Sequence, residues 1–417
     1  GGAANMERVI FHCDCNSFYA SVELLRHPEL RAVPVAVCGD PTNRHGVILA
    51  KNEAAKRFGV QTAETVYAAC RKCPDLHLLP PHHDEYRRMS RVVNAIYARY
   101  TDLVEPFGID ESWLDMTGSW HLFGKSPAEV ADRLRREVKE ETGLTISVGV
   151  SFNKVFAKLG SDYRKPDATT VIFAGDVERI VHPLPVEALL YVGKSACCTL
   201  RAMGIRTIGE AAKADEEALA AALGKAGRQL SRYARGLEDS PVRPAGQPRE
   251  IKTVGNGMTF RRDLTAPEEV RAGLQALADE VACRLREKGL YASAVQVVIK
   301  DPAFHSISRQ MPLNAPTCVG RELAEAALEL VKKSTGFRTP IRMLTVTAMQ
   351  LTDTPDSAQL SLFEAPGKAE REKRERLERS MDAIRQKYGK HAIASADVLK
   401  NDIGLRGLKI QEGDEEA

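Results

Sequence analysis

The sequence predicts a soluble α+β protein of several domains. At 417 residues the chain is too long for one compact core, and its 43% hydrophobic and 28% charged residues are ordinary for soluble domains. Short apolar strand patterns alternate with amphipathic helix patterns, and the alternation resumes after a proline-rich linker. No apolar run approaches 18 residues and no signal-peptide pattern is present, so we expect a cytoplasmic protein without a membrane span.

Charge and cysteine content exclude some classes of protein. The net charge of +3 is small, so any nucleic-acid binding must come from local patches. Nine cysteines, an odd number, fit reduced thiols better than a disulfide framework. Cys70 and Cys73 form a CxxC pair without a second pair at zinc-ribbon spacing, so we do not expect a zinc site. We also expect the natural chain to start at Met6, after Gly1 to Asn5.

The first strand carries the first unusual acid. Val9 to Cys15 is almost entirely apolar, which predicts a buried central strand, and Asn16 to Glu23 then predicts a cap and a helix. Asp14, a charged residue at the end of such a strand, is not explained by apolar packing. It could be a helix cap or a satisfied buried acid, and the end of a central strand is also a common place for a metal ligand.

The next elements follow from the same periodicities. The predicted strands and helices are 34–39 (strand), 47–50 (strand), 52–58 (helix), 83–100 (helix), 103–107 (strand), 113–116 (strand), 127–142 (helix) and 145–150 (strand). Between two of these strands lie the adjacent acids Asp110 and Glu111, inside apolar residues. They could be a hairpin turn in water. If they are buried, their like charges call for a cation, and Asp14 at a second strand end favours a metal site.

A lysine-bearing segment follows the last of these strands. Residues 153–166 predict a helix that ends before Pro166, with Lys154, Lys158 and Lys165 near one face. Such a stripe is ordinarily exposed to solvent, but beside three acids it could bind a triphosphate or the acids themselves. Three acids at two strand ends suggest the two-metal arrangement for phosphoryl transfer, in which Mg²⁺ suits carboxylate ligands.

These motifs together resemble a known family. The blocks 12–23, 109–112 and 153–158 with 165–166 look like those of Y-family translesion DNA polymerases of the DinB (polymerase IV) type, and the likeness runs in order from Met6 to about Phe363. The resemblance implies a right-hand polymerase with a ferredoxin-like palm, small fingers, a helix-hairpin-helix thumb and a βαββαβ little finger. It implies template-directed, low-fidelity DNA synthesis past damaged bases. No segment is left over for a proofreading exonuclease.

The resemblance also implies domain limits. We expect the palm at 6–18 and 86–173, fingers at 19–85, thumb at 174–240, linker at 241–250, little finger at 251–353 and tail at 354–417.

Residue roles follow from the matched motifs. Asp14, Asp110 and Glu111 match the metal-binding carboxylates, with Asp110 and Glu111 as catalytic acids and two Mg²⁺ ions per site. The Cys15 carbonyl is a further ligand. Tyr19 matches the steric gate that excludes a 2′-hydroxyl, although it could also be ordinary helix packing. The expected nucleotide contacts are Phe18, Tyr19, Lys56 and Lys165.

Several positions depart from the family pattern. Glu53 and Lys56 stand where a tyrosine and an arginine are expected on the triphosphate. Lys56 still supplies positive charge, as a point charge and not a bidentate fork, whereas Glu53 cannot repeat the tyrosine's donation. Gly108 stands where a serine is frequent, and Asn16 where a second acid is frequent.

DNA contacts are expected from later segments. Residues 189–205 resemble a helix-hairpin-helix in which Gly193 and Lys194 hold a phosphate without reading sequence, and 223–227 resemble a weaker copy; a plain αα-hairpin is the alternative. In the little finger, strands are expected at 294–300, 306–312 and 341–351 and helices at 268–288 and 321–333. The expected phosphate contacts there are Lys300, Arg261, Arg262, Arg309 and Arg342.

The tail contains an apolar motif in polar surroundings. Gln359, Leu360, Leu362 and Phe363 resemble the motif that binds the β subunit of the bacterial sliding clamp, and a chance apolar stretch is the alternative. Residues 368–388 predict a charged helix with i,i+4 pairs, and 393–410 suggest no function. We expect a monomer whose partners are primer–template DNA, dNTP and the clamp.

Two other functions remain open at this point. A non-catalytic accessory protein would bind DNA and the clamp, but such proteins lose the three acids, which are present here. A nucleotidyl cyclase also places metal carboxylates on a palm-like sheet, but it has no use for the hairpin-helix and clamp motifs.

Overall fold

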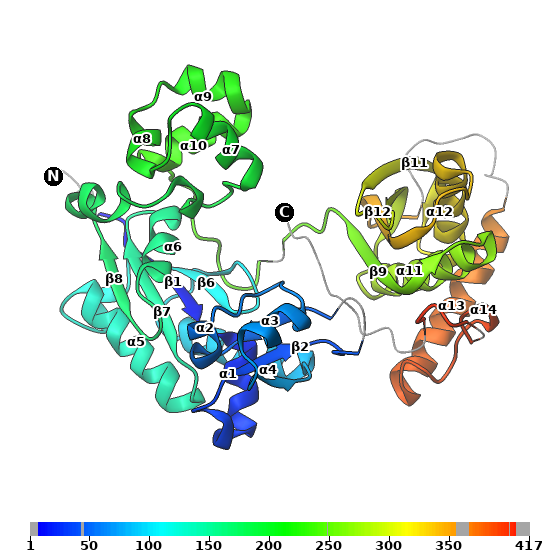
Figure 1. Cartoon of the computed structure of the whole chain (residues 1–417), viewed down its shortest axis with the longest axis horizontal. Helices are drawn as coiled ribbons and strands as arrows, with labels where there is room; N and C mark the ends of the chain where they lie inside the picture. Colours follow the sequence, from blue (N-terminus) through cyan, green and yellow to red (C-terminus); the bar gives the residue numbers. More distant parts are fainter. Residues whose placement is uncertain (1–6, 43–45, 248, 356–366, 400, 406–417) are drawn as a thin grey trace. The chain divides into compact units, whose positions relative to one another are not determined.

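The computed structural model describes residues 7–42, 46–247, 249–355, 367–399 and 401–405 (Figure 1). They fall into two compact units, Gly1–Gln247 and Pro248–Ala417. Among the described residues, every helix is too short or too polar to span a lipid bilayer.

The first unit is built on a five-stranded sheet in the order β5-β6-β1-β7-β8. Neighbouring strands are antiparallel, except β7 and β8, which are parallel. All six residues of β1 are buried, so the apolar run predicts the central strand correctly. The strands are β1 (Ile10–Cys15), β5 (Val104–Pro106), β6 (Glu111–Asp115), β7 (Ile146–Ser151) and β8 (Thr169–Ile172).

Helices cover both faces of this sheet. Phe11 and Cys13 face a core formed with α1 (Phe18–Arg26), α4 (His83–Ala98) and α5 (Pro127–Thr142). Ile10 faces the other side, where Ala157 of α6 (Lys154–Tyr163) contributes to a small apolar cluster. Because strand side chains alternate, His12 and Asp14 share this second face with Ile10.

Helix α6 lies directly on the sheet, beside β1 and β7 (Figure 1). It can do so because Gly149 of β7 has no side chain: a Cβ there would lie 1.8 Å from the carbonyl oxygen of Ala157. Asn153 begins the helix by accepting the N–H of Phe156 at 2.8 Å, and the helix ends at Tyr163, ahead of Pro166 as predicted. Its lysines are thereby brought over the face that carries Asp14.

A three-stranded sheet in the order β3-β2-β4 forms a smaller layer of the first unit. Asn52 joins its parts, because its side chain accepts the N–H groups of Val35 and Ala55, each at 3.0 Å, and donates to the carbonyl of Val33 at 2.8 Å. Two of its elements, α3 and β4, are absent from the sequence prediction. The elements are β2 (Val35–Cys38), β3 (Ile48–Lys51), α2 (Glu53–Arg57), α3 (Val66–Lys72) and β4 (His77–Leu79).

Four helices complete the first unit around an apolar core that they share with α6 and β8. Gly193 precedes the first of them, and Gly224, with a φ of 63°, makes the sharp turn between the last two. The helices are α7 (Lys194–Ala202), α8 (Ile208–Lys213), α9 (Glu216–Leu223) and α10 (Lys225–Ala234).

The chain leaving these helices stays on the first unit. Val242 is buried beside Trp113, and the Arg243 side chain contacts the carboxylate of Glu105 at 3.1 and 3.2 Å. The N–H of Ala245 donates to the carbonyl of Asp102 at 2.9 Å. The first half of the expected linker is therefore docked.

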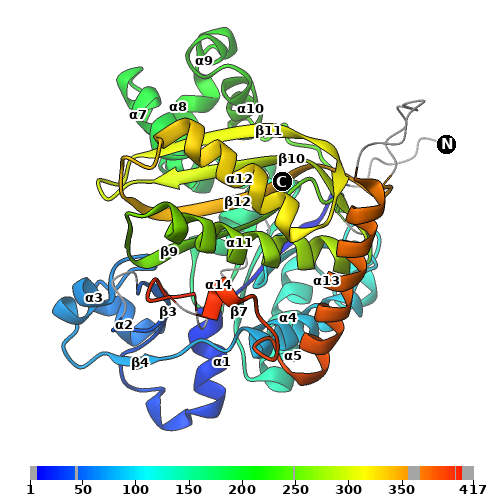
Figure 2. The same cartoon turned by 90° about the vertical axis from the view of Figure 1, so that its right-hand side faces the viewer.

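The second unit has the predicted βαββαβ order, with a four-stranded sheet in the order β11-β10-β12-β9 and both helices on one face (Figure 2). Strand β11 continues to Thr317, beyond its predicted end at 312. It is the edge strand, where Pro312 and Pro316 remove no essential ladder bond. The elements are β9 (Val254–Leu264), α11 (Pro267–Glu287), β10 (Tyr291–Lys300), β11 (Ser306–Thr317), α12 (Gly320–Thr335) and β12 (Ile341–Thr352).

The charged helix α13 (Lys368–Tyr388) is docked on this unit through ion pairs (Figure 2). Arg286 of α11, with 3% of its side chain exposed, donates to the carboxylate of Asp382 at 2.6 and 3.0 Å and also contacts Glu378. Glu378 in turn accepts the N–H of Gly320, the first residue of α12, at 3.0 Å. The helix therefore supplies the counter-charge of a buried arginine.

The segment after α13 also joins the second unit. The short helix α14 (Ala396–Leu399) follows it, and Ile403 and Leu405 are buried in the core. The N–H of Arg261 on β9 donates to the carbonyl of Ile403 at 3.0 Å. This segment, whose sequence suggests no function, therefore contributes to the folded core of the second unit.

We expect Asp382→Ala to lower the unfolding free energy of the second unit by about 2–4 kcal/mol, because it leaves Arg286 buried with one carboxylate fewer. The effect is measured by urea unfolding of the full chain, in which hydrogen exchange at β10 and β12 reports on the second unit. Glu372→Ala removes the same charge from an exposed position of α13 and is expected to change stability by less than about 0.5 kcal/mol. Equal effects of the two changes would contradict a structural role for the docked helix.

Candidate active site

Three acids meet at one edge of the five-stranded sheet. Asp14 is the penultimate residue of β1 and lies opposite Glu111, the first residue of β6. Asp110 precedes Glu111, and its carbonyl accepts the N–H of Cys15 at 2.9 Å. Asp14 is only 8% exposed. Glu111 has only 16% of its side chain exposed and contacts Lys158, so a hairpin turn with both acids in water, the alternative left open by the sequence, is not what the structure shows.

Two of the acids are paired with basic side chains from α6 and the residues just after it. Lys158 Nζ contacts Glu111 Oε2 at 2.8 Å, and Lys165 Nζ contacts Asp14 Oδ2. His12 Nε2 lies 3.2 Å from the same oxygen of Glu111. Among the described residues, no basic side chain is paired with Asp110.

The electrostatics of the three carboxyls differ. Burial, together with the negative charges of Asp14 and Glu111, raises the pKa of Asp110 to about 7. Burial also opposes the ionisation of Glu111, but His12 and Lys158 outweigh it and lower the pKa of this carboxyl to about 2. Burial raises the pKa of Asp14 in spite of Lys165. Three carboxyls therefore share the site with Lys158 and Lys165, which pair with Glu111 and Asp14.

The donor set fits a divalent cation. A Cβ on Gly108 would lie 3.6 Å from Asp110 Oδ1 and 3.9 Å from Glu111 Oε1, so both oxygens border the same space. Carboxylate oxygens are the ligands that Mg²⁺ prefers, and a cation would relieve the charge that raises the pKa of Asp110. No three acidic, histidine or cysteine side chains in the described ranges are already arranged as metal ligands, and Asp14 and Glu111 contact lysines.

The third lysine of the stripe serves a different acid. Lys154 Nζ contacts Glu105 at 2.8 Å and lies 4.6 Å from the ring centroid of Trp113. The stripe is therefore not a solvated face, because each of its lysines has a carboxylate partner.

Positive charge also gathers at a small hollow of about 230 Å³ beside β3 and α2. Burial, followed by the charges of Lys56 and Lys165, lowers the pKa of Lys51, while Glu53 opposes them. The ammonium groups of Lys51, Lys56 and Lys165 are thus close enough to interact, and together they would attract an anion. Residues lining the hollow are Lys51, Lys56, Gly59, Val60, Gln61 and Thr62.

Tyr19 lies at the start of α1 in an aromatic group. Its ring stacks on Tyr86 with 4.2 Å between centroids and an angle of 14°, and it makes a T-shaped contact with His83 at 5.8 Å between centroids. The hydroxyl of Tyr86 donates to Glu23 at 2.6 Å, which fixes this ring. The neighbouring Phe18 is 4% exposed, so its side chain belongs to the core.

Asn16 has a structural role at the end of β1. Its carbonyl oxygen accepts from Thr145 at 2.9 Å and from the N–H of Asp167 at 3.0 Å, and its amide donates to Ser147 at 2.9 Å. This departure from the family pattern therefore holds the strand end next to the segment after Lys165. Helix α1 begins at Phe18 with Ser17 as its N-cap, as the cap-and-helix pattern predicts, and Ser17 is in a left-handed conformation without a side-chain cap bond.

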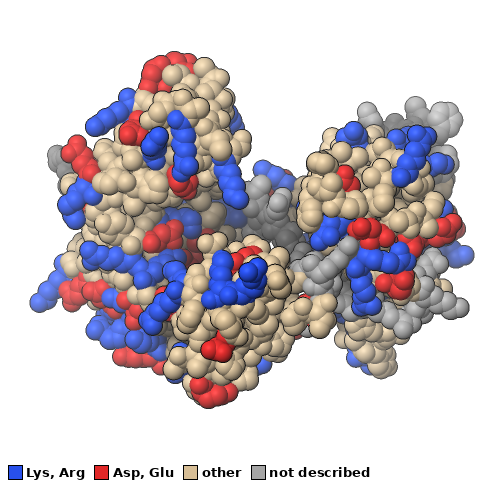
Figure 3. All heavy atoms as spheres, in the orientation of Figure 1, with Lys and Arg blue, Asp and Glu red and all other residues tan. Residues whose placement is uncertain are grey.

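The candidate DNA contacts have different surroundings. Gly193 and Lys194 are exposed at the start of α7, and Arg309 is exposed on β11. Arg262 is paired with Glu269 and with Asp402 at 2.7 Å, and Arg342 stacks on Phe304 at 4.5 Å. On the visible face of each unit, basic side chains are interspersed with acidic ones (Figure 3).

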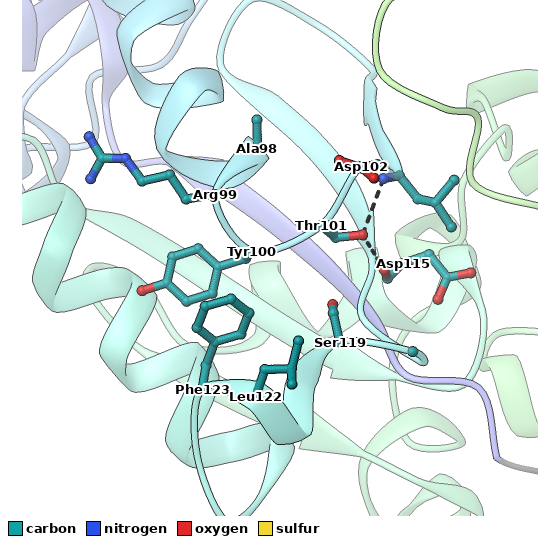
Figure 4. Close-up of a pocket in the computed structure, with 11 residues that line it drawn as sticks. Ala98, Arg99, Tyr100, Thr101, Asp102, Asp115, Ser119, Leu122 and Phe123 are labelled. Carbon is teal, nitrogen blue, oxygen red and sulfur yellow. Dashed lines mark hydrogen bonds between the residues drawn. The ribbon is translucent and has the colours of Figure 1, made fainter.

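A second hollow, of about 370 Å³, lies at the other end of β6, away from the acids. Thr101 donates to the carbonyl of Asp115 at 2.8 Å and accepts from the N–H of Leu103 at 3.1 Å, so its hydroxyl is satisfied locally (Figure 4). The rings of Tyr100 and Phe123 close one side. We assign it no role.

Two sequence features lie apart from this site. The motif at Gln359, Leu360, Leu362 and Phe363 falls outside the described residues. Cys70 and Cys73 are free thiols, of which Cys73 is buried.

Sequence reasoning missed His12. It lies within the apolar run of β1, two residues before Asp14, and the alternation of strand side chains places both on one face. That spacing was the available signal, but the partners of His12 come from α6 and β6, far away in the sequence.

Comparison with known proteins shows the family of the chain. A model of the impB/mucB/samB family matches residues 13–162, and a model of the C-terminal domain of that family matches residues 251–362. The chain is 45% identical over 403 residues to the DNA polymerase IV of Acetivibrio thermocellus, across 97% of this chain and 100% of that protein. It is 36% identical to DNA polymerase IV 1 of Bacillus subtilis, across 95% of this chain and 94% of that protein.

One solved structure shows the same fold. A Y-family DNA polymerase chimera superposes with a TM-score of 0.74, and the match covers 83% of this chain and 100% of the chimera. At 20% sequence identity this similarity concerns the fold.

Proposed function

The chain belongs to the impB/mucB/samB family of Y-family DNA polymerases, and we propose that Asp14, Asp110 and Glu111 form its catalytic centre. The enzyme is a DNA-directed DNA polymerase of translesion synthesis, with DNA and dNTP as substrates and divalent metal ions as cofactors. The observation that carries the proposal is the convergence of the three acids at one sheet edge. The non-catalytic alternative is not favoured.

We propose two Mg²⁺ ions as the physiological cofactors, held by the three carboxylates and the Cys15 carbonyl. When bound, such ions lower the pKa of the attacking 3′-hydroxyl and stabilise charge on the leaving pyrophosphate. The chain's own part is to hold Asp110 and Glu111 in register with Asp14. The backbone bond from Cys15 to Asp110 and the α6 contacts to Glu111 support that arrangement.

Nucleotide binding is assigned to the basic residues around the acids. Lys165 would leave Asp14 and take the triphosphate, with Lys56 on the same phosphates and Lys51 adding charge from the neighbouring hollow. Tyr19 would pack under the sugar and clash with a 2′-hydroxyl. Residue 18 would contact the nucleotide through its main chain, since its side chain is buried.

DNA binding is assigned to both units. The palm (6–18 and 86–173), fingers (19–85) and thumb (174–240) fall in the first unit, and the little finger (251–353) in the second. Gly193 and Lys194 at the start of α7 would hold a phosphate through main-chain N–H groups. Arg261, Arg262 and Arg309 would contact the backbone, and Arg262 must first exchange its carboxylate partners for phosphate.

Primer extension by the wild-type chain tests the assignment. With Mg²⁺ and dNTP, extension is expected on an undamaged template and past an abasic site, and it should require a primer. Nucleotide cyclisation without DNA, in place of primer extension, would contradict it.

We also propose that residues 359–363 bind the sliding clamp, and that the protein acts as a cytoplasmic monomer. Deleting 359–363 should abolish clamp-stimulated synthesis and leave synthesis without clamp unchanged, because the segment lies far from the acids in the sequence. Primer extension with and without clamp measures this. A deletion of the same length at 411–415 is the control, and equal clamp stimulation in both deletions would contradict the motif.

A further inference from the structure

His12 is a fully buried polar side chain that none of the roles above uses. It lies in the middle of β1 with no exposed surface, between Trp113 of β6 and Gly149 of β7, on the face that α6 covers. Its ring packs against that of Trp113 in a T-shaped arrangement, with 5.4 Å between ring centroids. A polar ring among apolar neighbours is costly unless its nitrogens are compensated, so its partners indicate why it is there.

The first nitrogen anchors the ring to α6. Nδ1 lies 2.6 Å from the hydroxyl oxygen of Ser161, which also lies 2.8 Å from the carbonyl oxygen of Lys158. Because a carboxylate only accepts, Nε2 carries the proton that faces Glu111, and in the neutral ring Nδ1 then accepts from the Ser161 hydroxyl. The orientation of the ring is thereby fixed by the helix that Gly149 admits to the sheet.

The second nitrogen faces Glu111. Nε2 makes no aligned hydrogen bond within the described residues and lies 3.2 Å from Glu111 Oε2. Lys158 contacts the same oxygen. Both contacts fall on Oε2, whereas Oε1 borders the space beside Gly108 that Asp110 Oδ1 also borders. The two oxygens of one carboxylate thus have different surroundings.

We propose that His12 is a positioning residue that holds Glu111 by one carboxylate oxygen, so that the other oxygen stays directed at the divalent cation. This inference rests on the proposed function of the three acids. His12 touches neither substrate nor reacting atoms and acts through Glu111. Lys158 cannot replace it, because a lysine with 21% of its side chain exposed is a flexible partner, whereas His12 is a rigid, fully buried ring.

Metal binding tests this role directly. Mn²⁺ is titrated by electron paramagnetic resonance into wild type, His12→Phe and His12→Gln, each bound to primer–template DNA. His12→Phe is expected to weaken Mn²⁺ binding about 10- to 100-fold, the usual effect of losing a partner of a metal ligand. The Mg²⁺ concentration for half-maximal extension should rise in parallel, with unchanged DNA affinity. His12→Gln, which retains a donor, should recover part of the loss. Wild-type Mn²⁺ affinity in His12→Phe overturns the proposal.

Further variants separate the possible causes. Ser161→Ala removes the partner of Nδ1 and should also weaken Mn²⁺ binding. If His12→Phe does not fold, wild-type Mn²⁺ affinity in Ser161→Ala overturns the proposal instead. Ser151→Ala removes another buried hydroxyl of this sheet, which donates to the carbonyl of Ile172 at 2.6 Å, and should change nothing.

Glu111→Gln distinguishes this inference from the proposed function. If it keeps wild-type Mn²⁺ binding, the proposed metal site is wrong and the role of His12 is overturned with it. If Glu111→Gln loses binding and His12→Phe does not, only the role of His12 is overturned. Loss in both, with partial recovery in His12→Gln, supports both.

Discussion

Asp110→Ala is expected to reduce primer extension by about 10²–10³-fold or more, with little loss of DNA binding. Asp110 is the acid whose charge is least compensated by the chain itself, which is why burial and its two acidic neighbours raise its pKa to about 7. Removing it deprives the site of the carboxylate that most needs a divalent cation. Single-turnover extension at saturating DNA and dNTP measures the rate, and fluorescence anisotropy measures DNA affinity.

The matched control is Asp102→Ala, which removes an exposed acid at the other end of the β5–β6 hairpin. Its rate should equal that of wild type. Normal extension by Asp110→Ala, or an equal loss in both variants, would contradict the catalytic assignment. Glu111→Ala should behave as Asp110→Ala does, because the proposed centre needs all three acids.

Tyr19→Ala is expected to raise ribonucleotide incorporation about 10- to 100-fold relative to deoxyribonucleotide incorporation. The gain reflects relief of the steric clash between the tyrosine ring and the 2′-hydroxyl. One extra group in a packed site typically costs about 1–3 kcal/mol. The Tyr19 ring is held at a defined angle by its stack on Tyr86, so it can exclude a hydroxyl by shape. The ratio of kcat/KM for the two nucleotides measures the discrimination.

Tyr19→Phe separates the ring from its hydroxyl. It keeps the stack on Tyr86, so discrimination should stay close to that of wild type. Unchanged discrimination in Tyr19→Ala would remove the gate role and leave Tyr19 as ordinary helix packing.

Local patterns predict the elements of this fold but not the contacts between distant elements. The run from Val9 to Cys15 predicts a buried strand, and the spacing of Lys154 and Lys158 predicts one helix face, whereas Lys165 lies beyond the end of that helix at Tyr163. Which lysine meets which acid depends on how closely α6 approaches the sheet. That approach is set by Gly149, which in the sequence is simply one glycine within a strand pattern.

The same limit explains the tail. The i,i+4 pairs of α13 are visible in the sequence and are present, for example between Arg379 and Glu375 at 2.7 Å. The pair between Arg286 and Asp382 spans 96 residues, and no periodicity connects its members. A highly charged helix is usually read as solvated, so its docking through charge could not be anticipated.

The pairing of Lys165 with Asp14 has a thermodynamic consequence for the proposed binding of nucleotide and cation. If Lys165 takes the triphosphate as proposed, it cannot also pair with Asp14, so nucleotide binding would uncover the charge of Asp14. A cation would then bind more tightly, and by reciprocity the cation would favour the nucleotide by the same factor. The two ligands would be cooperative, and one ammonium group that exchanges partners would be sufficient to link them.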